Sequence, residues 1–249
     1  MSGTNLRAVP GDQRTNAEGK QVINKVLLAT PDDEYDLMRA DLTHIDLPSH
    51  LSLHEPTQKI EFVYFPNRGM VSQVVVTKDG RTVEVGVVGK EGYVGAGLAT
   101  GLSRSSVREV IQIAGDGFRM MGNALERILQ SAPQLRILLN RHTGLQGMQV
   151  AQTAACNRLH DIRQRLSRWL LMTQDRVDSG VLAITHDFIA TMMGTDRSTV
   201  SLAASVMQND GIIDYARGEV KILNRRKLER SACECYGVIQ QLEDELGLR

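Results

Sequence analysis

The sequence has little of several features that define whole classes of protein. It has only three cysteines among 249 residues, and an odd number does not fit the paired disulfides of a small secreted protein. It has no apolar run of about 18 residues, so we expect no membrane-spanning helix. Its 29 basic and 29 acidic residues cancel, which argues against a coat of positive charge for nucleic acid but leaves local patches open.

Targeting and catalytic signatures are also missing. The N-terminus lacks the apolar segment of a signal peptide, so we expect a cytoplasmic protein. We find no nucleophile motif, phosphate-binding loop or pair of acids suited to catalysis, so we expect no enzyme. We also expect no required cofactor.

Cysteine and histidine do not form a metal motif in the sequence. Cys233 and Cys235 offer too few ligands for a zinc site alone. Together with Cys156 they could form a thiol switch, but three partly buried thiols is the interpretation that we favour. His50 and His54 have the i, i+4 spacing of helical metal ligands, yet prolines flank them closely. We therefore expect surface histidines and no metal site.

The pattern of apolar residues changes twice along the chain. Helical spacing from Ile23 to about Leu53 predicts one or two short helices. Residues 59–66 and 70–88 are rich in Val, Phe and Tyr, and the turn at 78–80, Lys-Asp-Gly, predicts a hairpin. Residues 106–115 alternate again. Several short strands with glycine-rich turns favour an antiparallel roll or barrel.

A long helix without full charges follows the strands. Between Arg141 and Arg158 there is no Asp, Glu, Lys or Arg, so this helix is not a solvated surface helix. It is either buried within its own chain or packed both on a second copy and on the β-roll, and we favour the second interpretation. Its spacing is heptad-like but interrupted by polar residues. The predicted dimer contacts are Leu138, Leu145, Met148, Gln152 and Ala155.

The segment from Thr185 to Gly218 predicts a helix, a turn, a helix and a small hairpin. Thr185 can cap a first helix, Gly194 breaks it, and Asp196 or Thr195 caps a second. The second helix starts with polar residues and continues with apolar ones that can pack on the first. An Arg at such a tip can read a guanine edge, and hydroxyls can reach phosphates. The turn at Arg217 and Gly218 predicts the hairpin, or wing.

These residues carry a family resemblance. Residues 182–229 resemble the DNA-binding domain of the Crp/Fnr family of bacterial transcription regulators, through Gly194, Arg197, the Thr-Val-Ser run at 199–201, the Gly-Ile-Ile run at 211–213 and the Arg-Gly pair at 217–218. The resemblance implies a homodimer on a roughly palindromic site in double-stranded DNA, with half-sites about 34 Å apart. It also implies RNA polymerase as a partner and control by a signal at the β-roll.

The resemblance assigns roles to particular residues. The implied DNA-contacting residues are Thr185, Thr195, Arg197, Ser198, Thr199, Ser201, Leu202 and Arg217. Ser198 and Leu202 stand where the cyclic-AMP-responding members carry Glu and a second base-reading Arg. Leu can touch a thymine methyl but cannot bond guanine, so we expect a different operator.

The sensor matches the family less well. Its cyclic-nucleotide-binding members use Gly-Glu for the ribose and Arg-Ser or Arg-Thr for the phosphate. Here Glu91 and Gly92 stand in reversed order, and Arg104, Ser105 and Ser106 follow a longer spacer. These four side chains other than glycine are the candidate effector-binding residues. Cyclic nucleotide, another small effector, or a roll without ligand all stay open, and the last is favoured. The iron–sulfur branch needs an N-terminal cysteine cluster, which is absent here.

The sequence therefore predicts an α+β chain with five segments. These are a flexible leader at 1–22, an antiparallel, jelly-roll-like β-roll sensor domain at 23–132, a dimerisation helix at 133–158, a winged helix-turn-helix domain at 159–230, and an acidic C-terminal helix or tail at 231–249. The expected function is regulation of transcription by sequence-specific DNA binding. The alternative is a protein-interaction or effector-binding module without specific DNA binding.

Overall fold

A computed structural model describes residues 14–177, 179–245 and 247 of the chain. The expected leader at 1–22 lies outside these residues up to position 13, but its last part is ordered, which corrects the prediction. Asn16 is fully buried, and its amide donates to the carbonyl of Leu42 at 2.9 Å. Its side-chain oxygen accepts from two backbone amides of the following turn. Polar composition misled here because these polar groups bond to backbone rather than to water.

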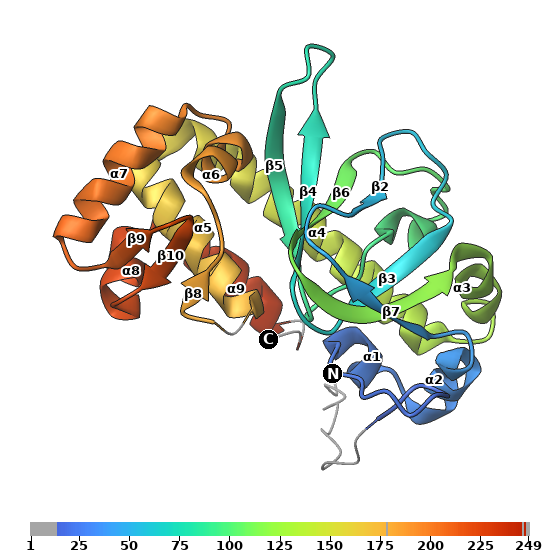
Figure 1. Cartoon of the computed structure of the whole chain (residues 1–249). Helices are drawn as coiled ribbons and strands as arrows, with labels where there is room; N and C mark the ends of the chain where they lie inside the picture. Colours follow the sequence, from blue (N-terminus) through green and yellow to red (C-terminus); the bar gives the residue numbers. More distant parts are fainter. Residues whose placement is uncertain (1–13, 178, 246, 248–249) are drawn as a thin grey trace, which may run out of the picture.

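Two antiparallel sheets form a β-roll (Figure 1). One has the strand order β1-β7-β3, and the other has the order β2-β6-β4-β5. The bounds are β1 Thr43–Leu47, β2 Ser52–His54, β3 Phe62–Pro66, β4 Met70–Val76, β5 Thr82–Val88, β6 Arg108–Ile113 and β7 Gly115–Met121. Phe65, Tyr93 and Phe118 are fully buried within the roll. The predicted α+β fold with a jelly-roll-like sensor domain is thus confirmed.

The N-terminal part of the roll has fewer helical residues than expected. Helices α1 (Lys25–Ala29) and α2 (Asp32–Arg39) precede it. The residues from Thr43 to His54, predicted as helical, instead form β1 and β2. β1 pairs with β7 along its whole length, so a long-range partner overrides the local helical spacing. The hairpin between β4 and β5 is confirmed, with Gly80 at a φ of 82° in its turn.

Helix α4 (Pro133–Leu159) has 27 residues and crosses the back of the roll (Figure 1). It follows the 3-10 helix η1 (Ala96–Thr100) and the helix α3 (Gly122–Ile128) in the chain. Leu135, Leu139 and Leu145 belong to the main core of the roll. His142 packs so closely on Gly92 that a Cβ there would lie 1.9 Å from its Nε2. A side chain at position 92 would therefore force the His142 ring to move.

The C-terminal third is a second unit, here called the reading unit, and its core also includes Met70 and Val87 of the roll. Its elements are α5 Ile162–Val177, β8 Val181–Leu182, α6 His186–Met193, α7 Arg197–Asn209, β9 Ile213–Ala216, β10 Glu219–Ile222, α8 Arg225–Ser231 and α9 Cys235–Glu245. Leu170, Val200 and Met207 are fully buried where α5 and α7 meet. The chain then returns, and α9 packs on α4 and α5. α9 therefore connects the reading unit to the long helix.

Candidate nucleic-acid interface

The first helix of the motif begins and ends as its residues predict. The Thr185 side chain accepts a hydrogen bond from the amide of Phe188 at 3.2 Å, which satisfies a free donor at the start of α6. Gly194 ends the helix with a left-handed φ of 61°, which costs glycine little. Asp196 occupies the N-cap position of α7 but its side chain makes no capping bond, so that part of the prediction is wrong.

The N-terminal end of α7 projects into solvent. The Arg197 side chain is 68% exposed and forms a 3.3 Å ion pair with the equally exposed Asp187. An exposed pair of this kind contributes little stability, so the guanidinium can leave it for another acceptor. Leu202, one turn further, is 70% exposed, and Ser198 is exposed as well. The opposite face, with Val200, is buried.

Ser201 makes a hydrogen bond to His186 that the sequence did not predict. The hydroxyl of Ser201 lies 3.0 Å from Nδ1 of His186, and the His186 ring stacks on Tyr215 at 3.7 Å between centroids. Partial burial, together with the Arg197 charge, lowers the pKa of His186 below its usual value. The ring is therefore neutral at pH 7. Tyr215 belongs to β9, so this stack joins the first helix, the second helix and the wing.

The wing is a two-residue hairpin. Arg217 and Gly218 both have positive φ, 53° and 81°, as a type I′ turn requires. They connect β9 to β10, which also pairs with β8. Arg217 is exposed at the tip. Thr185 is also exposed, while Thr195 and Thr199 are partly exposed, so all the predicted DNA-contacting residues remain within reach of a ligand.

The candidate effector residues have different partners: Glu91 bonds to α5, whereas Arg104 and Ser105 bond to backbone carbonyls of loops in the roll. Glu91 is buried and accepts a hydrogen bond from Arg176 Nε at 2.7 Å. Burial alone would raise the pKa of Glu91, but the Arg176 charge and hydrogen bonds from backbone amides together outweigh it, so the pKa is lowered. Arg104 instead donates to the carbonyl of Thr57 at 2.6 Å, and Ser105 donates to its own loop. Ser106 is exposed beside them.

A charged cleft lies beside Glu91. Its volume is about 430 Å³, and Lys25, Lys90 and Arg225 line it together with Glu91 and Arg176. It lies at the junction of the roll with α5 and α8, not at the loop of Arg104. The prediction grouped Glu91 with that loop because it followed the order of a family motif. The partner of Glu91 in the ion pair is Arg176 of α5, which lies 85 positions further along the sequence.

Only part of the predicted dimer surface is available on α4. Leu138 and Leu145 are buried within their own chain, so they cannot contact a partner. Gln152 donates to the sulfur of Cys235. Met148 is 53% exposed, and Ala155 is exposed on the same side of the helix. These two lie on an exposed stripe, here called the α4 stripe, made of Ile137, Gly144, Met148, Ala151 and Ala155.

Comparison with known proteins supports the prediction of a helix-turn-helix domain. Residues 164–231 match the family model of the Crp-like helix-turn-helix domain. No curated protein matches the chain. Among solved structures, a Crp/Fnr-family regulator from Eubacterium rectale superimposes with a TM-score of 0.62 at 15% identity, over 80% of this chain and 94% of that one.

Two further structures agree. The c-di-GMP-responsive regulator CLP of Xanthomonas campestris has a TM-score of 0.64 at 16% identity and covers 78% of this chain and 100% of its own. FixK2 of Bradyrhizobium japonicum has a TM-score of 0.63 at 16% identity, with 77% and 98% covered. At this identity the likeness establishes the fold. The resemblance to Crp/Fnr regulators is thus confirmed, and residues 164–231 match a Crp-like helix-turn-helix domain. No helix among the described residues is both long and apolar enough for a membrane span.

Proposed function

Because residues 164–231 match a Crp-like helix-turn-helix domain on a Crp/Fnr fold, we propose that this chain regulates transcription as a homodimer that binds a specific DNA sequence. The observation that carries the proposal is the exposed N-terminal end of α7. Its Arg197 is held only by a surface ion pair, while the helix behind it is anchored in a core. This is the geometry of a helix that enters the major groove.

The exposed residues divide into two roles. Arg197 reads a guanine edge through two parallel hydrogen bonds, and Leu202 contacts a thymine methyl one turn further along α7. Ser198 lies beside Arg197. Thr185, Thr195, Thr199, Ser201 and Arg217 contact the DNA backbone. Backbone contacts fix the position on the duplex, whereas base contacts select the sequence. Leu202 cannot bond guanine, so the half-site differs from one that two arginines read.

The α4 stripe forms the dimer interface. Its small residues allow a second helix to approach closely, and Met148 supplies apolar area at its centre. A two-fold axis through this stripe would present one α7 tip per half-site, about 34 Å apart. Residues that face the roll, such as Leu145, hold the helix in place instead.

The remaining assignments extend the same proposal. The protein acts in the cytoplasm, where bacterial DNA lies, and it catalyses no reaction. It contacts RNA polymerase at regulated promoters. A small effector, if the roll responds to one, binds near the charged cleft beside Glu91, and cyclic nucleotide is one candidate to add to the DNA-binding assay. No cofactor is required for DNA binding itself.

A selection of bound duplexes from a random pool tests the proposal. The full-length chain should enrich an inverted repeat with half-sites about one helical turn apart. Arg197→Ala should relax the preference at one base pair of each half-site. Arg127→Ala is the matched control, because Arg127 is also exposed and ion-paired but lies on α3, on the opposite side of the molecule from α7 (Figure 1).

Salt dependence separates this function from the protein-interaction alternative. Each cation that neutralises a phosphate releases counterions, so DNA affinity should fall steeply as salt rises. A module without DNA affinity would enrich no sequence, and its retention of DNA would be weak at every salt concentration. That result, obtained with a correctly folded dimer, would favour the alternative.

A further inference from the structure

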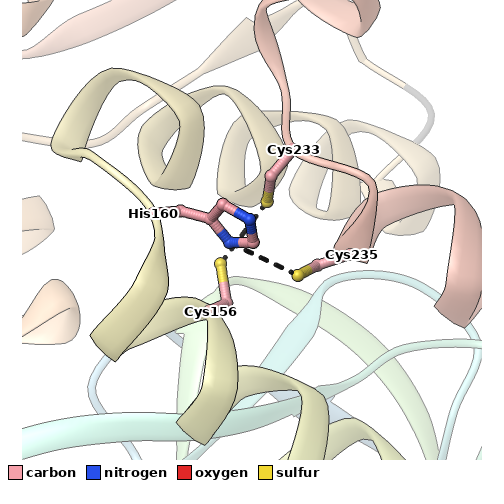
Figure 2. A group of neighbouring side chains, drawn as sticks. All are labelled: Cys156, His160, Cys233 and Cys235. Atoms are coloured by element: carbon pink, nitrogen blue, oxygen red, sulfur yellow. Dashed lines mark hydrogen bonds between the residues drawn. The ribbon is translucent and has the colours of Figure 1, made fainter.

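Four side chains meet where α4 ends. Cys156 lies in the last turn of α4, and His160 immediately follows that helix. Cys233 and Cys235 come from the junction of α8 and α9. Figure 2 shows all four side chains pointing toward one another. Their four ligand atoms lie within 4.8 Å of one another, although up to 79 positions separate them in sequence.

The distances match those between ligands around a tetrahedral ion. Zinc binds sulfur at about 2.3 Å and nitrogen at about 2.0–2.1 Å, so tetrahedral edges are about 3.8 Å between sulfurs and about 3.6 Å between sulfur and nitrogen. The sulfurs of Cys156 and Cys233 are 3.5 Å apart. The sulfur of Cys235 is 3.6 Å from Nδ1 of His160. A disulfide instead needs sulfurs about 2.05 Å apart.

We propose that Cys156, His160, Cys233 and Cys235 bind one zinc ion in a closed tetrahedral site, here called the Cys₃His site. Three thiolates and one imidazole are soft and borderline ligands, which favour Zn²⁺ over Mg²⁺ or Ca²⁺. Four protein ligands leave no open position for a substrate, so the ion is structural. Binding releases the thiol protons, since the metal coordinates thiolate.

The surroundings of the four ligands suit a bound ion. Nε2 of His160 lies 3.3 Å from the carboxylate of Glu234, and metal-bound histidines commonly donate their second N–H to a carboxylate. The amide of Gln152 donates to the sulfur of Cys235 at 3.0 Å. Zinc with three thiolates carries one net negative charge, which the buried Arg168 nearby offsets.

The position of the site gives it a consequence for the whole molecule. His160 is the residue at which α4 stops, and α5 begins at Ile162. The site therefore spans the joint between the long helix and the reading unit. It also fastens the start of α9 to that joint. A bound zinc ion would hold the α7 tips at one placement relative to the α4 stripe.

Metal content of the full-length protein tests the site directly. The chain is purified without a metal-affinity tag, and we expect one equivalent of zinc by mass spectrometry of the metals. Replacement by Co²⁺ should give the thiolate charge-transfer and d–d bands of a tetrahedral site. His160→Gln should lose the zinc, whereas His160→Cys should retain it as a four-cysteine site. His160 is chosen because the cysteines are more deeply buried, so cysteine variants could simply misfold.

Two control variants sharpen the test. His50→Gln removes a histidine far from the site, in the turn before β2, and should keep the zinc. Glu234→Gln should weaken zinc binding by about tenfold while leaving the ligands in place, and Glu126→Gln, at an exposed glutamate on α3, should have no effect. Amide exchange around residues 156–162 should rise when a chelator removes the ion.

Several results would overturn the proposal. One is a folded protein that takes up no zinc when Zn²⁺ is added. A second is a disulfide between Cys156 and Cys233 in the freshly isolated protein. A third is iron with inorganic sulfide, instead of zinc, at the site. Equal zinc in the wild type and in His160→Gln would also contradict it. These results concern the metal alone, because zinc content and sequence-specific DNA binding are measured separately and can fail separately.

Discussion

The tip of α7 and the Cys₃His site are the two clusters to which we assign functions, and they differ in their place in the sequence and in their exposure. The proposed DNA-contacting residues lie within the stretch from Thr185 to Arg217 and are exposed or partly exposed. The Cys₃His residues come from the end of α4 and from the junction of α8 and α9, and their cysteines are almost fully buried. The first cluster is available to bind a ligand outside the chain, whereas the second would cross-link two distant parts of the same chain. Substitutions in the first cluster should therefore alter DNA binding and leave stability unchanged. Substitutions in the second should lower stability before they alter DNA binding.

The largest expected effect is the removal of metal. At a free zinc concentration about 1,000 times the dissociation constant, binding adds about 4 kcal/mol to the free energy of unfolding. For a chain of this size that corresponds to a fall of about 10 °C in Tm when a chelator is added. Thermal unfolding with and without chelator measures it. His160→Gln should start at the lower Tm and not respond, and an equal response from this variant would break the comparison.

The next largest effect is expected from Met148→Asp, which should dissociate the dimer without unfolding the monomer. The two-fold axis would bring the new carboxylates together, and like charges at an interface cost several kcal/mol. We expect the dimer to dissociate about 100-fold more readily while the Tm of the monomer changes little. Sedimentation of the two proteins measures this. Leu145→Asp is the matched variant on the buried face and should lose folded protein instead; a folded monomer from it would contradict this division of the helix.

Glu84 offers a buried polar contact that tests the joint between roll and reading unit. Trp169, the single tryptophan, donates to its carboxylate at 2.8 Å. Burial raises the pKa of Glu84 to about 7, above the unfolded value of 4.5. The folded state therefore binds more protons between these values, so stability rises as pH falls from about 7 to 4.5, by about 3 kcal/mol at most. This gain should be missing in Glu84→Gln.

Fluorescence of Trp169 gives a second measurement of the same contact. It should change with a midpoint near pH 7 in the wild type and stay flat in Glu84→Gln. If both proteins titrate alike, the carboxylate beside the indole is not the group that responds.

Arg197→Ala should cost roughly 1–3 kcal/mol of DNA affinity per half-site, because one bidentate base contact is lost. Its Tm should stay near that of the wild type, since the side chain is exposed and its only ion pair is weak. Titration of the selected operator, with Arg127→Ala alongside, measures the difference. A large loss of Tm would mean that the α7 tip also serves the fold.

The smallest effect is expected at the wing. Arg217→Ala should weaken binding evenly across sequences and reduce the slope of log affinity against log salt by about one. Lys221→Ala, in β10 of the same hairpin, is a matched change of charge away from the turn. A change of sequence preference in Arg217→Ala would give the wing a base contact that we do not assign to it.

These differences explain what the sequence could and could not predict. Thr185 caps α6 with its side chain, and Gly194 and the pair at Arg217 and Gly218 act through their backbone conformation. These roles are local, so they can be inferred from a few neighbouring residues. The partner of Cys156 depends on where α9 returns, which no local pattern encodes. The His186–Tyr215 stack escaped for the same reason.

The errors on α4 and in the roll have a similar origin. Heptad-like spacing shows that a helix has an apolar face but not where the contact with the roll ends, so Leu145 and Met148 were assigned together although Leu145 is buried in its own chain and Met148 is 53% exposed. Glu91 was assigned from a motif order, but its charge is neutralised by Arg176 from α5. An ion pair between residues far apart in the sequence cannot be predicted from the pattern of either segment alone.

The most direct test of the central claim is a double-mutant cycle between Arg197→Ala and the guanine that it is proposed to read. Affinity is measured for both proteins on the selected operator and on one with that base pair changed to A·T. If Arg197 reads the guanine, each single change costs roughly 1–3 kcal/mol per half-site and the double change costs little more than one of them. If instead the two losses simply add, Arg197 does not contact that base and the account of α7 is contradicted.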